Sequence, residues 1–545
     1  MSLQELMRQR REKLAKWRAL GVEPYAYRFE PTHHAADLVA RGESITETPG
    51  EVVRLAGRIL TLRGHGKAGF AHLLDGSGRI QLYFKAEVLG EAFARYDLLD
   101  VGDWIGVSGP LFRTRTGEIT VRVDALELLA KAVRPLPEKW HGLKDPETRY
   151  RQRYADLFMN LEVREAFRRR ARLTSAMREF LDQRGYLEVE TPVLQPLYGG
   201  AFARPFVTRH RALDMDLYLR ISNELYLKRL IVGGLERVYE FSRDFRNEGM
   251  DRSHNPEFTM LEFYQAFADV HDMMDLTESL VGHAVTRACG GLAVEGPGGT
   301  LDFTPPWPRV SMPVAVGEKV GEKIGDLDPA RLTRLAKQHG IEARPGTGPG
   351  GLLDELFSAL VQPSLQRPCF VVDYPREVSP LARAKRGNPA LVERFEVFVA
   401  GMEIANAFSE QNDPEVQAQA FEDQMARRAA GDEEAQVMDH DYVRALEYGM
   451  PPTGGVGIGI DRLVMLITGA RSIRDVILFP QLRPEEGRAE IEPEADEAAA
   501  PQPGSAPAQR AAAAIGAPAR KPAAGAAAGT AGRKRSPGPR GATTP

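Results

Sequence analysis

Two strand-like stretches separated by a short charged segment constrain the fold of this chain most strongly. The first, RVYEFSRDFRNEG (237–249), alternates apolar and polar residues with the period of a strand, so that Arg246 and Glu248 share one face. The second, FTMLEFYQAF (258–267), carries Glu262 inside an otherwise apolar strand. Two neighbouring strands joined in this way predict a hairpin, whose charged tip is most often simply solvated. A function for the charged segment has to come from the rest of the chain.

Length and composition limit the class of protein. A chain of 545 residues holds roughly two to four domains. Its 43% hydrophobic and 27% charged residues are typical of a soluble globular protein. The net charge of -4 restricts any nucleic-acid surface to a local patch. The two cysteines, Cys289 and Cys369, lie far apart, which excludes a disulfide framework and a four-cysteine zinc site and indicates a reducing compartment.

The N-terminal segment and the apolar runs bear on location. MSLQELMRQRREKLAKWRALG is charged throughout and lacks the apolar core of a signal peptide. No run approaches the ~18 apolar residues that a membrane span requires. We therefore expect a cytoplasmic protein. Residues 3–20 predict one amphipathic helix, whose basic face is either a solvated surface or an RNA-binding face.

Short β segments dominate residues 52–130, with turn signals at DGSG (75–78) and TRTGE (114–118). Several short strands in one such span predict a small barrel such as an OB-fold. Phe70 and Gln81 are expected on its outer face, where an aromatic ring and an amide can stack on and read an unpaired base. Ordinary surface decoration of a barrel is the commoner explanation.

A second domain follows a proline-punctuated, basic stretch at 131–160, which predicts a linker. This domain mixes helices with β-rich blocks, and its long excursions between strands favour an α+β antiparallel sheet over a doubly wound one. After Pro484 the composition is mostly Ala, Pro and Gly, which predicts disorder. The predicted segments are an N-terminal helix and lead-in (1–50), an OB-fold domain (51–145), the α+β domain (146–488) and a disordered tail (489–545).

Several residues of the second domain can bind a nucleotide. Arg246, at a strand end, can clamp a phosphate through two hydrogen bonds while Glu248 orients the rest of the nucleotide. In GGVGIGIDRLVML (454–466), three glycines at period two leave a strand face on which a flat group can lie, with Arg462 at its edge. The spacing matches neither a Rossmann nor a Walker motif. We expect an adenine site here, the alternative being a packing strand.

Four acidic residues are candidates for binding cations. Glu262 is costly in an apolar strand unless it is paired. Glu224 is also flanked by apolar residues, near a predicted helix start where the helix dipole is a sufficient explanation. Together the two acids predict a pocket for an ammonium group. Glu396 and Glu403 flank a predicted tight turn and can share Mg²⁺, although this spacing is common among surface acids.

Taken together, these blocks resemble those of bacterial class II lysyl-tRNA synthetases from about residue 5 to 485. The three class II signatures of that family are matched by GYLEVETPVLQPLYGGAFARPF, by FRNEGMDRSHNPEFTMLEFY and by GIGIDRLVMLITGARSIRDVILFP. The second and third are highly specific at this length. The resemblance implies an N-terminal OB-fold anticodon-binding barrel, a class II antiparallel-sheet catalytic domain with flanking helices, and a homodimer built through the first signature.

The resemblance also implies roles for individual residues. Catalysis would involve Arg246, Glu248 and Arg462. The ATP contacts would be Arg246, Glu248, His254, Phe258, Glu396 and Arg462. The lysine contacts would be Glu224, Glu262, Tyr264, Asn406 and Glu410. The magnesium ligands would be Glu396 and Glu403, and the anticodon contacts would be Phe70, Gln81 and Glu118.

The implied activity is lysine–tRNA ligation. The lysine carboxylate attacks the α-phosphate of ATP, and the terminal ribose of tRNA(Lys) then takes the lysyl group, with several Mg²⁺ ions per subunit as cofactors. Such a transfer depends on positioning and charge neutralisation more than on a protein nucleophile. The chain departs from the family at Ala405 and Ala407, where glycines are common, and at Ser222–Asn223, where Ala–Pro is common. These changes affect fine tuning and leave the charged residues intact.

Three alternatives remain at this level. Aspartyl- and asparaginyl-tRNA synthetases share the barrel and the signatures, but their substrates call for a basic pocket and not for acids at 224, 262 and 410. A lysine-adenylating relative that modifies an elongation factor lacks the N-terminal barrel. A catalytically inactive RNA-binding paralogue is disfavoured because Arg246, Glu396, Glu403 and Arg462 are all present.

Overall fold

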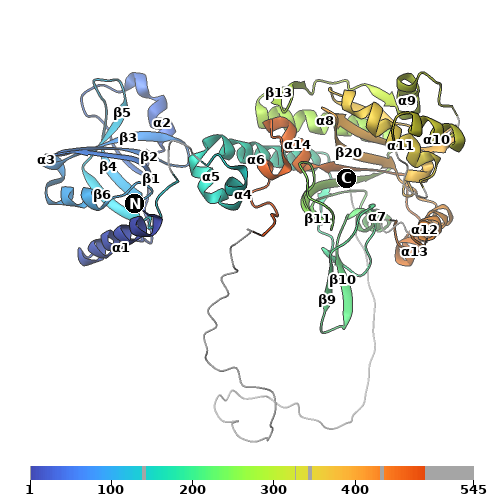
Figure 1. The fold of residues 1–545 in the computed structure, drawn as a ribbon, viewed down its shortest axis with the longest axis horizontal. Coiled ribbons are helices and arrows are strands. Elements are labelled where there is room, and N and C mark those ends of the chain that lie inside the picture. Colours follow the sequence, from blue (N-terminus) through green and yellow to red (C-terminus); the bar gives the residue numbers. More distant parts are fainter. Residues whose placement is uncertain (1, 138–142, 326, 342–346, 430–434, 485–545) are drawn as a thin grey trace, which may run out of the picture. The chain divides into compact units, whose positions relative to one another are not determined.

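The computed structural model describes most of the chain up to residue 484. The described ranges are 2–137, 143–325, 327–341, 347–429 and 435–484. Figure 1 shows the elements in chain order. The predicted disordered tail (489–545) lies outside the described residues. Among the helices that are described, none is both long and apolar enough to cross a membrane.

The N-terminal domain is a closed β-barrel. Its strands are β1 (Val52–His65), β2 (Ala68–Leu74), β3 (Arg79–Lys85), β4 (Trp104–Arg113), β5 (Ile119–Val123) and β6 (Ala125–Ala130). They follow the order β1-β2-β3-β5-β4-β6, and an additional β1–β4 pairing closes the barrel. The pairing of β3 with β5 is parallel, whereas the other pairings are antiparallel. This topology confirms the predicted OB-fold.

Alternation along the strands separates the barrel core from its surface. In β3, Ile80, Leu82 and Phe84 are buried, while Gln81 and Tyr83 lie on the outer face. The predicted N-terminal helix is α1 (Leu3–Ala19), which is capped by the Ser2 side chain and buries Trp17 in the barrel core. The short elements are α2 (Ala35–Ala40), η1 (Gly42–Ser44), α3 (Ala86–Leu89) and η2 (Gly90–Leu98).

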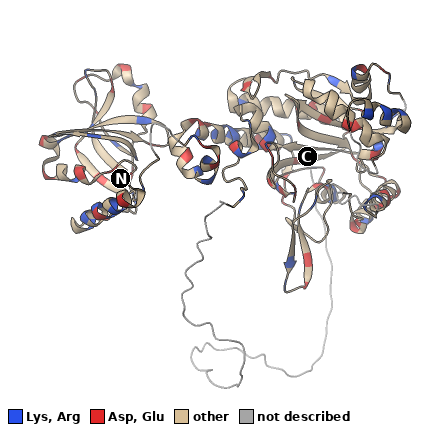
Figure 2. Cartoon of the chain, in the orientation of Figure 1, with Lys and Arg blue, Asp and Glu red and all other residues tan. Residues whose placement is uncertain are grey.

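The second half of the predicted linker is helical instead. Helices α4 (Pro146–Arg151) and α5 (Arg153–Met159) occupy most of 146–160 and precede the long helix α6 (Leu161–Asp182). Arg153 is fully buried, and its guanidinium donates to the carbonyls of Leu478 and Arg474 and pairs with Asp156. The linker prediction was wrong for this half because it rested on proline and basic composition, which does not show that Arg153 is buried in tertiary contacts. Figure 2 shows how many basic residues α4, α5 and α6 carry.

The second domain is built on an eight-stranded sheet. Its order is β15-β16-β19-β20-β21-β12-β11-β7, antiparallel except for the outermost pairings at the two edges, β15–β16 and β7–β11. The strands are β7 (Leu187–Glu188), β11 (Arg237–Phe245), β12 (Glu257–Ala266), β15 (Arg309–Ser311), β16 (Cys369–Val372), β19 (Arg394–Val399), β20 (Met402–Ser409) and β21 (Thr453–Gly459). The predicted hairpin is β11–β12, and the predicted α+β antiparallel sheet is confirmed.

Helices cover this sheet. The main ones are α6, α8 (Val270–Cys289) and α14 (Ile460–Thr468), whose apolar faces pack with β12, β20 and β21 in one core. A capping box formed by Asp269 begins α8. The other helices are α7 (Glu224–Val232), α9 (Met312–Val320), α10 (Pro329–Gln338), α11 (Pro349–Leu360), α12 (Pro414–Ala429), α13 (His440–Glu447), α15 (Ile473–Val476), η3 (Gln362–Ser364) and η4 (Arg376–Val378).

The remaining strands form small sheets. One sheet consists of β8 (Leu194–Gln195), β9 (Val207–His210) and β10 (Met215–Leu219). A second pairs β13 (Ala293–Gly296) with β14 (Gly299–Asp302), and a third pairs β17 (Ala384–Lys385) with β18 (Asn388–Val392). Within the first signature the strands are β7 and β8, each two residues long.

The barrel closes through a glycine that tolerates no side chain. A Cβ built on Gly109 in β4 would lie 1.8 Å from the carbonyl oxygen of Arg122, which is backbone and cannot rotate away. Gly109→Ala should therefore lower the free energy of unfolding by about 1–3 kcal/mol in urea titrations. Gly76→Ala is the matched control, because a Cβ there meets nothing within 4 Å. Equal stability of the two variants would contradict this packing.

Candidate active site

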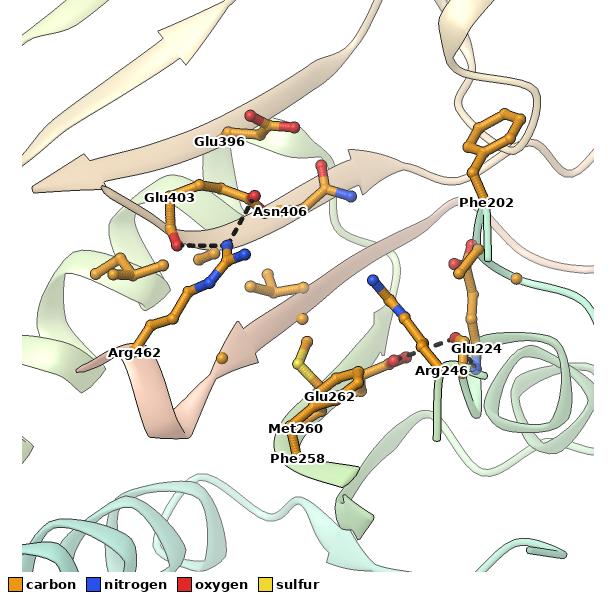
Figure 3. A pocket seen from close by; sticks show the side chains of 18 of the residues that line it. Phe202, Glu224, Arg246, Phe258, Met260, Glu262, Glu396, Glu403, Asn406 and Arg462 are labelled. Carbon is orange, nitrogen blue, oxygen red and sulfur yellow. Dashed lines mark hydrogen bonds and ion pairs between the residues drawn. The ribbon is translucent and has the colours of Figure 1, made fainter. Parts of the chain in front are cut away.

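One pocket beside the large sheet gathers the predicted site residues. It has a volume of about 360 Å³ and is lined by residues from β12, β20, β21, the β11–β12 loop and the start of α14 (Figure 3). All twelve residues predicted outside the barrel line it: Glu224, Arg246, Glu248, His254, Phe258, Glu262, Tyr264, Glu396, Glu403, Asn406, Glu410 and Arg462. The structure thus brings together side chains that span almost 240 residues of sequence.

Strand register explains how these residues meet. Glu262 in β12 pairs with Gly457 in β21, Gly457 pairs with Asn406 in β20, and Asn406 pairs with Glu396 in β19. Paired residues of antiparallel strands point to the same face of a sheet. The row therefore presents a carboxylate, a bare backbone, an amide and a second carboxylate across four adjacent strands.

The glycines of β21 form the floor of the pocket, as predicted. A Cβ on Gly455 would lie 2.2 Å from Oε1 of Glu410, whereas one on Gly457 would lie 3.3 Å from the Met260 methyl. At Gly459 the nearest atom is 3.8 Å away. The floor is therefore filled beneath Glu410 and open beside Arg462, which leaves a flat surface at the Arg462 end.

Arg246 has binding capacity that the protein does not use. Its guanidinium lies 5.0 Å from the centre of the Phe258 ring, and its buried Nε finds no hydrogen-bond partner among the described residues. A buried hydrogen-bond donor without an acceptor is costly, especially on a group that is always charged. A bound anion would supply the missing acceptor. This arrangement suits a phosphate.

Arg462 is held at the other end of the pocket. Its Nη1 donates to Oε2 and to the backbone carbonyl of Glu403, both at 3.0 Å, as Figure 3 shows. Its Nη2 lies 3.2 Å from Nε2 of His254. Because a guanidinium only donates, Nε2 accepts, and the ring hydrogen sits on Nδ1, 2.8 Å from Asp251. His254 is thereby oriented by Arg462 and Asp251.

Glu262 is a buried acid without a cationic partner among the described residues. It accepts hydrogen bonds from the Tyr264 hydroxyl at 3.0 Å and from the Ser222 hydroxyl at 3.3 Å. Burial raises the pKa of Glu262 well above its usual value, and the nearby carboxylates of Asp244 and Glu224 raise it further. A cationic ligand beside Glu262 would remove this penalty.

Lys228, which the sequence did not single out, is fully buried beside the other two acids. Its Nζ lies 2.5 Å from Oε1 of Glu224, one helical turn earlier in α7, and also pairs with Glu410. Burial favours a lower pKa for Lys228, but the two carboxylates outweigh burial and raise the pKa. The protein itself therefore supplies a cation to Glu224 and Glu410, but not to Glu262.

A second buried network fixes the start of α7. Arg220 Nη1 donates to Oε1 of Glu240 at 2.7 Å, and Asn223 and Thr191 donate to the other oxygen of Glu240. Arg220 also lies 3.3 Å from Asp244. The network ties the first signature, β11 and α7 together, so that Glu224 is presented from a fixed helix end. Arg220 and Glu240 were not predicted as site residues.

The predicted magnesium ligands lie on the two strands that the β19–β20 turn joins, Glu396 in β19 and Glu403 in β20. Ala400 and Gly401 in this turn adopt positive φ angles. Arg394 pairs with Glu396 and donates to Asn406 at 3.0 Å, while the Tyr374 hydroxyl donates to Glu396 at 2.8 Å. Burial raises the pKa of Glu396 to about 7, with further contributions from Glu403 and Asp354. The described residues contain no group of three or more His, Cys, Asp or Glu side chains arranged to hold a metal ion.

The three predicted barrel residues lie on one face. Phe70 is 40% exposed and stacks on Tyr83 with the ring centres 4.8 Å apart. Gln81 Nε2 donates to Oε2 of Glu118 at 2.6 Å. A pocket of about 480 Å³ is lined by Gln81 and Glu118 together with His72, Arg79 and Arg113. The face combines a stacking surface with fixed polar groups.

With this geometry in view, the chain can be assigned to a family. Residues 145–483 match the family model described as tRNA synthetases class II (D, K and N), and residues 53–129 match that of the OB-fold nucleic acid binding domain. The chain belongs to the class II tRNA synthetases.

Relatives place the chain more narrowly within this class. It is 54% identical over 484 residues to the lysine–tRNA ligase of Carboxydothermus hydrogenoformans, covering 88% of this chain and 99% of the relative. It is 54% identical over 492 residues to that of Roseiflexus castenholzii, covering 89% and 100%, and 49% identical over 487 residues to that of Clostridium botulinum, covering 88% and 96%. The resemblance to bacterial lysyl-tRNA synthetases is confirmed.

The buried lysine gives a test of this site by stability. Lys228→Met leaves Glu224 and Glu410 buried without their cation, and should lower the free energy of unfolding by about 3–5 kcal/mol in urea titrations. Arg8→Met removes a cation with the same spacing to Glu12, but on the exposed face of α1, and should leave stability nearly unchanged. If the two variants unfold alike, Lys228 is not the counter-ion described.

Proposed function

We propose that this protein activates L-lysine with ATP to form lysyl-adenylate and transfers the lysyl group to the 3′ end of tRNA(Lys). The observation that carries the choice of amino acid is the acidic end of the pocket. Three buried carboxylates, Glu224, Glu262 and Glu410, face a space in which Lys228 supplies only one positive charge. The ammonium groups of lysine complete this charge balance. An acidic or amide side chain would not.

The pocket residues divide the work between the two substrates. Glu262 and Tyr264 would bind the ε-ammonium group, with Glu224, Asn406 and Glu410 binding the remaining polar groups of lysine. Arg246 would hold the α-phosphate, and Phe258 and Arg462 would enclose the adenine above the glycine floor, with Glu248 and His254 contacting the nucleotide. All these assignments rest on the places of the side chains in one pocket and on the family.

The chemistry needs orientation and charge neutralisation. A carboxylate oxygen of lysine attacks the α-phosphorus, and the bond to the bridging oxygen of the β-phosphate breaks, so that pyrophosphate leaves. A terminal ribose hydroxyl of tRNA then attacks the acyl carbon, and AMP leaves with the bond electrons while the hydroxyl proton is lost. Arg246 would stabilise the charge that develops on the phosphate oxygens.

Glu396 and Glu403 fit the chemistry of a magnesium site. Their oxygens are the hard ligands that Mg²⁺ prefers. Burial raises the pKa of Glu396, and the nearby Glu403 and Asp354 carboxylates raise it further, so a bound cation would favour the charged form of Glu396. When bound with ATP, the metal would neutralise phosphate charge. Arg394 and Tyr374 would keep the Glu396 carboxylate in place.

The barrel and the surface suggest the remaining partners. We propose that Phe70, Gln81 and Glu118 contact the anticodon of tRNA(Lys).

Exposed apolar side chains along the first signature and β9 support a homodimer: Val193, Leu194, Leu197 and Val207. The proposed limits are 51–145 for the anticodon-binding domain and 146–488 for the catalytic domain, between a lead-in (1–50) and a tail (489–545). The proposed location is the cytoplasm.

The phosphate assignment is tested by Arg246→Ala. The variant loses a charged donor to the reacting phosphate, and lysine-dependent ATP–pyrophosphate exchange should fall by roughly 10²–10³-fold. Arg243→Ala is the control, because Arg243 lies on β11 with its side chain about half exposed and outside the pocket. Normal exchange by the Arg246 variant would remove this residue from the nucleotide site.

The amino acid is tested by exchange with each of the twenty amino acids, in the wild type and in Glu262→Gln. Lysine alone should support rapid exchange. The Gln variant keeps the shape of the site but not its charge, so lysine binding should weaken by about 2–5 kcal/mol while the apparent ATP constant stays the same. Leucine and methionine should stay rejected, because they cannot satisfy the buried polar groups.

The pH dependence gives an independent check of Glu262. Because its pKa is raised by burial and neighbouring acids, Glu262 binds a proton at low pH and competes with the substrate ammonium. The apparent lysine constant of the wild type should therefore fall as the pH rises through this raised pKa. Glu262→Gln should lose that part of the profile. An unchanged lysine constant in the variant, or efficient exchange with another amino acid, would overturn the proposed substrate.

A further inference from the structure

His72 lies at the centre of a hydrogen-bonded row on the outer face of the barrel. It is paired with Thr61 of β1 and with Gln81 of β3, and Gln81 is paired in turn with Thr120 of β5. Glu118 immediately precedes β5. The row therefore crosses four neighbouring strands. It contains Gln81 and lies beside Glu118, two of the residues proposed to contact the anticodon.

The hydrogen bonds fix which nitrogen of His72 carries the hydrogen. Nε2 lies 2.9 Å from Oε1 of Glu118, and a carboxylate only accepts, so Nε2 donates. Nδ1 lies 2.8 Å from the hydroxyl of Thr61. The backbone N–H of His72 already donates to this hydroxyl at 3.2 Å, which leaves the hydroxyl hydrogen free to point at Nδ1. The hydrogen bond from Thr61 thus favours the tautomer in which Nε2 of His72 carries the hydrogen and donates to Glu118.

The Glu118 carboxylate is held at both oxygens. His72 donates to Oε1, and Gln81 Nε2 donates to Oε2 at 2.6 Å. The Gln81 amide is itself oriented, because the Thr120 hydroxyl donates to its oxygen at 2.8 Å. The Glu118 side chain is 45% exposed, so without these donors solvent would leave it free to sample several rotamers.

A stacking surface adjoins this fixed edge. Phe70 lies two residues before His72 on the same face of β2 and stacks on Tyr83, which lies two residues after Gln81. An unpaired base on Phe70 would place its polar edge near Glu118 and Gln81, where free lone pairs of the carboxylate can accept a base N–H. Such pairing depends on direction and tolerates little rotation of the carboxylate.

We propose that His72 is a positioning residue for base recognition: it holds the Glu118 carboxylate in the direction that reads an unpaired base stacked on Phe70. This inference rests on the proposed function of the barrel in anticodon binding, and it adds a residue that would touch Glu118 and not the base. Holding the carboxylate before tRNA arrives removes an ordering cost from the binding step.

The test compares His72→Ala with His72→Gln in aminoacylation of a tRNA(Lys) transcript. The Ala variant should raise the KM for tRNA about 5- to 15-fold, with kcat little changed, because Glu118 keeps its contact with the base but loses the hydrogen bond that orients it. Glutamine carries an amide nitrogen at about the distance of Nε2 and should restore most of the loss. Lysine-dependent pyrophosphate exchange, which needs no tRNA, should be unaffected in both.

The same barrel offers a matched control. His33 is bonded to Thr32 through Nδ1 at 2.8 Å and to Glu51 through Nε2 at 3.1 Å, which repeats the Thr–His–Glu arrangement outside the pocket of Gln81 and Glu118. His33→Ala should leave the KM for tRNA unchanged. Glu118→Ala should raise it, and adding His72→Ala to Glu118→Ala should cause no further loss, since His72 acts through Glu118.

Two failures are distinguishable. If Glu118→Ala raises the KM for tRNA and His72→Ala does not, or if the double variant shows additive losses, His72 does not act through Glu118 and the inference is overturned. If neither Glu118→Ala nor Gln81→Ala affects tRNA, the barrel face is not the anticodon site and the proposed function of the barrel fails. A loss of pyrophosphate exchange in His72→Ala would reveal a folding role and overturn the inference as well.

Discussion

The buried pair of Arg220 and Glu240 is the contact on which the active-site end of the sheet depends. Arg220 holds Glu240 and also approaches Asp244, while Thr191 and Asn223 complete the bonds of the Glu240 carboxylate. Burying a carboxylate is tolerable only with such complete satisfaction. The pair links the segment before α7 to β11, and the antiparallel register then carries the alignment from β11 across to Glu262, Asn406 and Glu396.

The positions of the charged residues in the pocket follow from this fixed arrangement of α7 and the sheet. Lys228 lies on α7, whose first residue is Glu224, so the helix that carries one acid also carries the cation for it. Glu410 shares that cation. Among the described residues, Glu262 on β12 has only hydroxyl donors as partners. Two of the three acids, Glu224 and Glu410, thus share the single positive charge of Lys228, whereas Glu262 pairs with no cation among the described residues.

Sequence reasoning found the residues whose type conflicts with their surroundings. Glu262 was visible as an acid in an apolar strand, and the β21 glycines as a strand without side chains. Lys228 and Arg153 were missed because a basic residue on a helix normally faces water, and only tertiary contacts reveal their burial. His72 was not predicted as a site residue. Its role depends on strand register, which brings Thr61, Gln81 and Glu118 around it and which no local pattern specifies.

The space above the glycines of β21 increases from Gly455 to Gly459, which has a consequence for small molecules that compete for this site. At Gly455 any added atom meets Glu410 and Tyr264, whereas beside Gly459 the nearest atom is 3.8 Å away. A competitive ligand therefore has to stay flat and compact over the acidic end, but can carry a small substituent toward Arg462. The acidic end is closed by buried side chains, so a competitive ligand can be enlarged only at the Arg462 end.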